Sequence, residues 1–331
     1  MLEKHSSGLP VRVVMETYRT AIQLKIAMLA EDKISNSPVP GEQAAGEIRE
    51  YIKRLQAAAT DAESSQTLAG IFVSLARDLR EQLEATTDDT KRRKMSETLL
   101  IVAVEAAKAD SFNTQYWAAD TIVSIAQELE KSAAGKAQAA TAYAEAAKIL
   151  EAILAKEKSQ PGWISPAAFA TQIHLRLAQT SRGRGDFKMA IEQLASVLEE
   201  NNALLDVQIE AARTYQAWGE ASNSGFYKVA IEGGRPDPKT RQKLIWGWGK
   251  IQQLTANNPN YSEQFYEARY QLAFSRWQYA QGLQDASQRA DEIRRAAYDI
   301  ESTAKLFPDL GGPLMKGKFQ ALLKKIQASI N

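Results

Sequence analysis

The sequence contains no cysteine and only two histidines among its 331 residues. The lack of cysteine excludes disulfide bonds, thiolate metal ligands and cysteine nucleophiles. The histidines, His5 and His174, are far apart in the sequence and lack the paired spacing of a helical zinc site. We therefore expect a non-catalytic protein that holds no metal and no cofactor.

Long apolar runs and an excess of one charge are also missing. No stretch is apolar for long enough to span a membrane, and the first residues lack the apolar core of a signal peptide. Lys and Arg total 41 and Asp and Glu total 40, so the formal net charge is +1. Because nucleic-acid binding takes many basic contacts, the short basic clusters at 91–94 and 182–185 are interpreted as solvent-facing. We predict no membrane insertion and no nucleic-acid partner, whereas the compartment stays open and the chain is compatible with a fragment of a longer protein.

Between its prolines the chain is rich in Ala, Leu, Glu, Gln, Lys and Arg, which are strong helix formers. No run alternates β-branched with polar residues, so we expect no strands. Short apolar stripes recur with the period of an amphipathic helix. The predicted helices span 11–32, 42–59, 64–86, 91–109, 112–130, 136–157, 165–182, 186–200, 204–219, 239–256, 261–282, 286–305 and 314–330, with a short turn of helix near 226–232.

Several helix starts are marked by capping residues. The sequence TDAE at 60–63 matches a capping box, in which the first and last side chains bond each other's backbone N–H groups. Ser165-Pro166 and Asp237-Pro238 each place a capping side chain before a proline, which is favoured at the first helical position. These pairs predict helices that begin at 165 and near 239.

The segment LIWGWGKIQQLTANNP at 244–259 places two glycines inside a predicted helix. Helical geometry aligns Trp248 with Leu244 and Ile251, which predicts a core position, and turns Trp246 toward the surface or an inter-helix seam. Glycine inside a helix costs about 1 kcal/mol relative to alanine, so we expect both glycines to allow close approach of a neighbouring helix. A phosphate-binding loop would need a preceding strand, and none is predicted.

Residues 171–204 carry the clearest repeat. Its first-helix, turn and second-helix positions hold Leu177, Ala178, Gly185, Asp186, Phe187, Ala190, Ile191, Leu194 and Leu198. In these positions the segment resembles a tetratricopeptide repeat (TPR). The similarity covers roughly 136–308, and the chain also resembles uncharacterised bacterial proteins of this repeat class. His174, Ser181 and Asn202 depart from the Trp, Tyr and Pro that the family prefers.

The resemblance implies an all-α fold, namely an α-solenoid of antiparallel helix hairpins in a right-handed superhelix. A closed toroid of helices is the alternative. We expect N-terminal hairpins with degenerate repeats at 1–135, followed by TPR-like repeats and a C-terminal capping helix at 136–331. Stacked helix pairs of this kind bury a continuous core between neighbouring units.

Solenoids of this family bind a peptide or a protein surface in a concave groove. Carried over to this chain, the groove residues are Gln179, Arg182, Arg213, Gln216, Tyr270, Phe274 and Trp277. The three aromatic residues among them continue a stripe that begins at Tyr266, while Ala268 and Leu272 lie on another face of the same predicted helix. A helix with two apolar faces is either buried on both sides or lines an exposed aromatic groove.

We therefore expect a non-catalytic scaffold whose groove binds a protein or peptide. One alternative is an all-helical carbohydrate-active enzyme, which would need two carboxylates about 5–10 Å apart in an aromatic cleft. Another is a self-assembling structural component, which would form oligomers.

Overall fold

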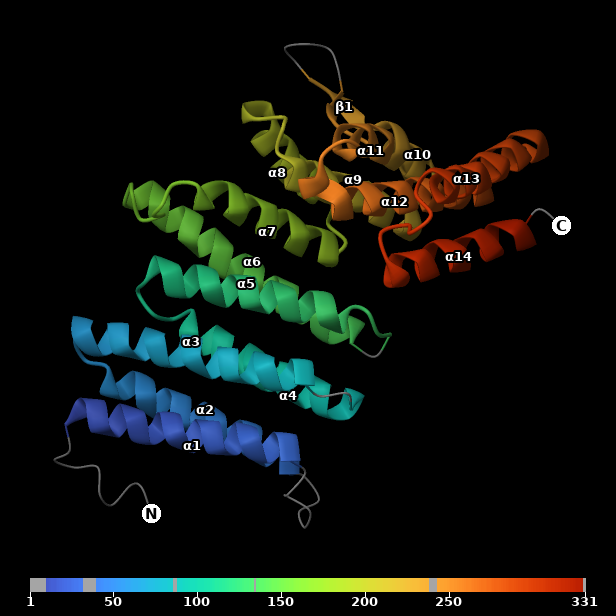
Figure 1. Ribbon diagram of the computed structural model, residues 1–331. Coiled ribbons are helices and arrows are strands. Elements are labelled where there is room, and N and C mark those ends of the chain that lie inside the picture. The colour runs from blue at the N-terminus through green and yellow to red at the C-terminus, as the bar shows by residue number, and fades with distance from the viewer. Residues whose placement is uncertain (1–9, 32–39, 86–87, 134, 238–242, 330–331) are drawn as a thin grey trace. The chain divides into compact units, whose positions relative to one another are not determined.

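A computed structural model of the protein describes residues 10–31, 40–85, 88–133, 135–237 and 243–329 (Figure 1). Most of these residues are helical, and consecutive helices pack on one another, which confirms the all-α, solenoid-like prediction. The chain forms two compact units, Met1–Arg176 and Leu177–Asn331. The division falls within helix α7 (Phe169–Gly183), and each unit is described separately below.

The N-terminal unit is built from six helices and the first part of α7. Figure 1 shows the six lying side by side, and they share one hydrophobic core in which Phe72, Leu75 and Tyr143 are fully buried. The domain boundary predicted after residue 135 falls between the fifth and sixth of these helices, which pack extensively against each other. The helices are α1 (Val11–Glu31), α2 (Pro40–Ala58), α3 (Ala62–Ala85), α4 (Asp89–Ala106), α5 (Phe112–Leu129) and α6 (Lys136–Ser159).

Helix α3 begins with a capping box one residue later than the sequence motif indicated. The Ser64 backbone N–H donates to Asp61 Oδ1 at 2.8 Å, and the Asp61 backbone N–H donates to Ser64 Oγ at 3.1 Å. The prediction of a box between Thr60 and Glu63 was therefore wrong. The aspartate fits the same role because its side chain is a strong N-cap acceptor.

The Asp61 cap makes the stability of the N-terminal unit depend on pH. Its hydrogen bonds from Ser64 lower the pKa of the Asp61 carboxyl below its ordinary value. A carboxyl with a lowered folded pKa stabilises the fold above its unfolded pKa, and that stabilisation is lost as the pH falls through the folded pKa. We expect Asp61→Ala to lower the melting temperature at pH near 7, and the deficit to shrink below about pH 4. Circular dichroism melts across this range measure it. Glu63→Ala is the control, and an equal, pH-independent deficit in both variants would contradict the assignment.

The C-terminal unit contains the remainder of α7 and the elements that follow it. Consecutive helices again pack on one another, and α12, α13 and α14 enclose a hydrophobic cluster centred on Phe319 and Ile300. The elements are α8 (Phe187–Glu200), α9 (Leu205–Ala221), α10 (Gly225–Glu232), β1 (Gly234–Pro236), β2 (Lys243–Ile245), α11 (Trp248–Thr255), the 3-10 turn η2 (Pro259–Tyr261), α12 (Ser262–Gln281), α13 (Ala286–Leu306) and α14 (Pro313–Ala328).

Two predicted helix starts are corrected by the structure. The helix expected from Ser165 begins at Phe169, and the Ser165-Pro166 pair precedes it with a cis peptide bond. The helix expected over 239–256 begins only at Trp248. The first residues of this predicted helix, and Pro238 directly before it, lie outside the described residues.

A short antiparallel hairpin occupies the chain between α10 and α11, so the expectation of no strands was wrong. Gly234 pairs with Ile245, and Pro236 pairs with Lys243. Gly233, at φ 84°, ends α10 in a backbone conformation that favours glycine and turns the chain into the hairpin. Strands of three residues are too short to produce an alternating sequence pattern.

One buried amide fastens this hairpin to α9. Gln208 Nε2 donates to the Asn202 carbonyl at 2.8 Å and to the Leu244 carbonyl at 3.0 Å. Its Oε1 accepts the backbone N–H of Trp246 at 2.7 Å. The Gln208 side chain thereby pairs with a carbonyl of β2, with the N–H that follows β2, and with a carbonyl just before α9.

The Gly-Trp-Gly segment is a packing feature, as predicted, although part of it lies outside the helix. Trp248 is fully buried, as expected, and Trp246 is partly buried. A Cβ atom at Gly247 would lie 2.3 Å from the Ile231 carbonyl oxygen and 2.4 Å from the Gly233 nitrogen. A strand does precede the glycines, so the reason given against a phosphate loop was wrong. Backbone atoms of Ile231 and Gly233 pack closely against Gly247.

Candidate binding surface on the C-terminal unit

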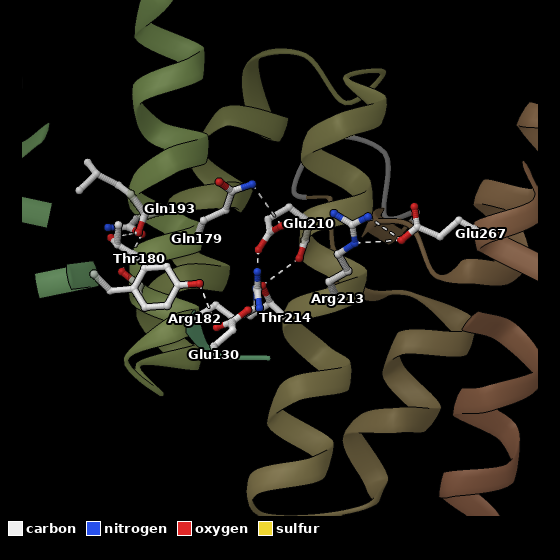
Figure 2. Close-up of polar contacts among 12 residues, drawn as sticks. Glu130, Gln179, Thr180, Arg182, Gln193, Glu210, Arg213, Thr214 and Glu267 are labelled. Atoms are coloured by element: carbon white, nitrogen blue, oxygen red, sulfur yellow. Dashed lines mark hydrogen bonds and ion pairs between the residues drawn. The ribbon is translucent and has the colours of Figure 1, made fainter. Parts of the chain in front are cut away.

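Two of the predicted groove residues bind a glutamate on the neighbouring helix. Arg182 Nε donates to Glu210 Oε1 at 2.6 Å, and Gln179 Nε2 donates to Glu210 Oε2 at 3.4 Å. Figure 2 shows both side chains reaching from α7 toward Glu210 on α9. The Glu210 side chain is only 2% exposed. Gln179 and Arg182 therefore join α7 to α9 and present little polar surface to a partner.

The next two predicted residues join α9 to α12. Arg213 donates from Nε and NH2 to Glu267 Oε1, at 3.0 and 2.5 Å (Figure 2). Gln216 is buried, and its Nε2 donates to Gln271 Oε1 at 2.9 Å and to Ser275 Oγ at 2.8 Å. The Arg213 side chain remains 42% exposed, so it is the member of this pair that a partner can reach.

The three aromatic residues of the predicted groove lie half-buried along α12. The Tyr270 ring meets Phe319 of α14 edge-on at 5.6 Å, and Trp277 Nε1 donates to Ser329 Oγ at 3.2 Å. Phe274 packs edge-on against Tyr227 of α10 at 6.3 Å. Burial raises the pKa of the Tyr270 hydroxyl, which keeps that side chain neutral.

The opposite face of α12 is buried, through Ala268 and Leu272. The aromatic face is only half-covered, by contacts with α10 and α14. α14, the expected capping helix, contributes to that cover.

A pocket of about 440 Å³ opens where α9, α12 and α14 meet. It contains two of the seven predicted groove residues, Arg213 and Tyr270. The other five lie outside its lining. The lining residues are Arg213, Ser262, Glu263, Tyr266, Glu267, Tyr270, Gln271, Gly311, Leu314, Met315 and Lys318.

The contribution of α14 to this pocket was missed in the sequence. Leu314 is 79% exposed, which is unusual for a leucine at the rim of a pocket, and Met315 lies beside it. The available signal was the apolar pair directly after Pro313, at the start of an otherwise lysine-rich helix. Sequence spacing alone does not say which earlier helix such a pair faces.

The pocket combines apolar walls with separate charges. Its aromatic and aliphatic side chains suit an apolar group, while Glu263 and Lys318 supply charges of opposite sign at its edge. Within the described ranges, Lys318 forms no ion pair. Over the same part of the chain, no three His, Asp or Glu side chains are grouped as metal ligands, and no helix is long and apolar enough to cross a membrane.

A second charged cluster lies between α12 and α13. Arg276 Nε is 3.1 Å from Asp299 Oδ2, and Arg269 NH1 donates to Thr303 Oγ1 at 2.9 Å. Burial raises the pKa of the Asp299 carboxyl and lowers the pKa of the Arg269 guanidinium. The cluster therefore cross-links two helices, and we interpret it as structural.

No family model and no curated protein matches this sequence. Among solved structures, the chain aligns with a circular tandem repeat protein that has a novel repeat topology and enhanced subunit contact surfaces, at 12% identity and TM-score 0.29, over 99% of this chain and 86% of the other. It also aligns with a protein from the computational design of self-assembling cyclic homooligomers, at 15% identity and TM-score 0.22, over 97% and 99% of the two chains. TM-scores this low do not establish a common fold. The comparisons therefore place the chain in no family.

Proposed function

We propose that the protein is a non-catalytic scaffold of TPR-like helix pairs that binds a peptide or a protein segment. The observation that supports this most directly is the pocket between α9, α12 and α14, where two predicted groove residues meet the exposed Leu314 and the partly buried Met315 of α14. Pockets with apolar walls and a few polar groups are the usual shape of a binding site. The bound segment would place an apolar side chain against Tyr266 and Leu314.

The charged side chains at the pocket are held in place by their neighbours. Arg213 donates two hydrogen bonds to Glu267, which fix the guanidinium at the pocket edge. A fixed guanidinium can pair with a carboxylate of a bound segment.

Replacing Leu314 with aspartate is expected to weaken binding at the pocket. Peptides selected from a displayed random library against the wild-type protein serve as probes, with affinities measured by isothermal titration. A buried hot-spot side chain contributes about 2 kcal/mol or more to binding. Leu314→Asp should therefore lower the affinity of the peptides that bind at the pocket at least about tenfold.

The matched control is Leu306→Asp. Leu306 is 64% exposed at the end of α13 and does not line the pocket. We expect this variant to retain wild-type affinity. If both variants bind every selected peptide as tightly as wild type, or lose affinity equally, the pocket is not the binding site.

A further inference from the structure

The last helix of the chain is held by a small part of its surface. Only Phe319, Leu322 and Ile326 of α14 are buried. These three side chains pack into the cluster formed with α12 and α13. No described element follows α14, so it can leave this position without unwinding another described element.

The segment that leads into α14 has an unusual backbone. Leu310, Gly311 and Gly312 have φ values of 49°, 80° and 100°, so three consecutive residues occupy the left-handed region. A residue with a side chain is disfavoured there, and Leu310 is such a residue. This backbone conformation directs α14 back onto α12 of the same chain, which we call the closed form. The cost of the conformation at Leu310 opposes the closed form.

We propose that α14 exchanges between two copies of this chain. In the exchanged dimer, residues 310–312 open, and α14 of each copy docks on α12 and α13 of the other. We assign α14 of a second copy as the partner because α14 of the same chain covers this surface of α12 and α13 in the monomer. Phe319, Leu322 and Ile326 can therefore make the same contacts between two copies. The inference does not depend on the proposed peptide-binding function.

Two effects set the balance between monomer and dimer. Tethering gives α14 a high effective concentration at its own α12, which favours the monomer. The left-handed backbone of Leu310 is needed only in the closed form, and its cost favours exchange. A change that penalises the closed hinge, and leaves the docking face intact, should therefore increase the dimer.

Gly311→Ala is that change. A Cβ atom at Gly311 would lie 2.7 to 3.1 Å from atoms of the Tyr266 side chain, and the residue has φ 80°. A residue with a side chain lowers the population of a left-handed backbone about tenfold relative to glycine. Each exchanged dimer contains two opened hinges, so this cost is removed twice. We therefore expect the dimer association constant to rise about a hundredfold, measured by light scattering coupled to size-exclusion chromatography. Gly312→Ala, at φ 100° with no neighbouring atom within 4 Å, should act in the same direction through the backbone alone.

The matched control is Gly317→Ala, because Gly317 lies within α14 and a Cβ atom there would meet nothing within 4 Å. It makes the same chemical change in the same region and should leave the association constant unchanged. Circular dichroism checks that each variant is folded. A monomeric Gly311→Ala protein at concentrations that saturate the expected dimer would overturn the proposal.

Complementation between two full-length variants tests whether the dimer forms by exchange. Tyr270→Asp damages the docking site for α14, and Phe319→Asp damages its buried face, since these two rings contact each other. In a Gly311→Ala background, each variant alone should be monomeric, whereas their mixture should form a one-to-one heterodimer. A dimer that persists in the Phe319→Asp variant alone, or a mixture that stays monomeric, would also overturn the proposal.

Discussion

Replacing Glu210 with alanine is expected to lower the free energy of unfolding of the C-terminal unit by about 3 kcal/mol. Glu210 accepts hydrogen bonds from Arg182 and Gln179 on the neighbouring helix. The substitution leaves the Arg182 guanidinium, which is only 16% exposed, without this carboxylate. Removing one partner of a buried pair costs more than the pair contributes, because the remaining charge stays desolvated.

Urea unfolding followed by circular dichroism measures this loss. Glu210→Gln retains an acceptor and the side-chain volume but removes the charge, so its loss should be smaller. Glu220→Ala is the matched control, because Glu220 lies on the same helix and is exposed. A Glu210→Ala protein as stable as the control would show that the α7–α9 contact contributes nothing to the fold.

Gly247→Ala is expected to destabilise the same unit by about 3 kcal/mol or to prevent its folding. The added methyl group would lie 2.3 to 2.5 Å from backbone atoms of Ile231 and Gly233. Backbone atoms at the end of α10 cannot rotate away as a flexible side chain can, so the hairpin and α11 must move. This position therefore requires glycine because of space, even though its own φ of −93° is accessible to any residue.

Gly249→Ala provides the comparison, two residues further along the chain. A Cβ atom there meets only the Ile231 carbonyl oxygen, at 3.3 Å, and Gly249 lies within α11. Alanine is favoured over glycine by about 1 kcal/mol inside a helix, which offsets this tighter contact. We expect a change of less than about 1 kcal/mol, measured by the same unfolding method. Equal destabilisation at both positions would contradict the close backbone packing at Gly247.

Amphipathic spacing predicted most helices well because it depends on the residues of one helix alone. The apolar stripe from Phe187 to Leu198 predicted a helix over 186–200, and α8 spans Phe187–Glu200. Helix α5 was predicted over 112–130 and spans Phe112–Leu129. In α8 the stripe residues Ala190, Ile191, Leu194 and Leu198 are also residues that the fold buries.

Other differences depend on contacts between distant segments. Leu244 and Trp248 are both buried, but the first lies on a strand that Gln208 holds in place from another helix. Gln179 and Gln216, which the family resemblance placed in a partner groove, are buried against Glu210 and Gln271. Helical spacing identifies the face that a residue occupies, and it does not identify what covers that face.

The hairpin makes one side chain on α9 difficult to replace. Gln208 donates to two carbonyl oxygens and accepts one N–H, and only a side-chain amide both donates and accepts in this way. Glutamate would bring its charge against two carbonyl oxygens, and an apolar residue would remove the partner of the buried Leu244 carbonyl. The short strands therefore restrict which side chain α9 can carry at this position.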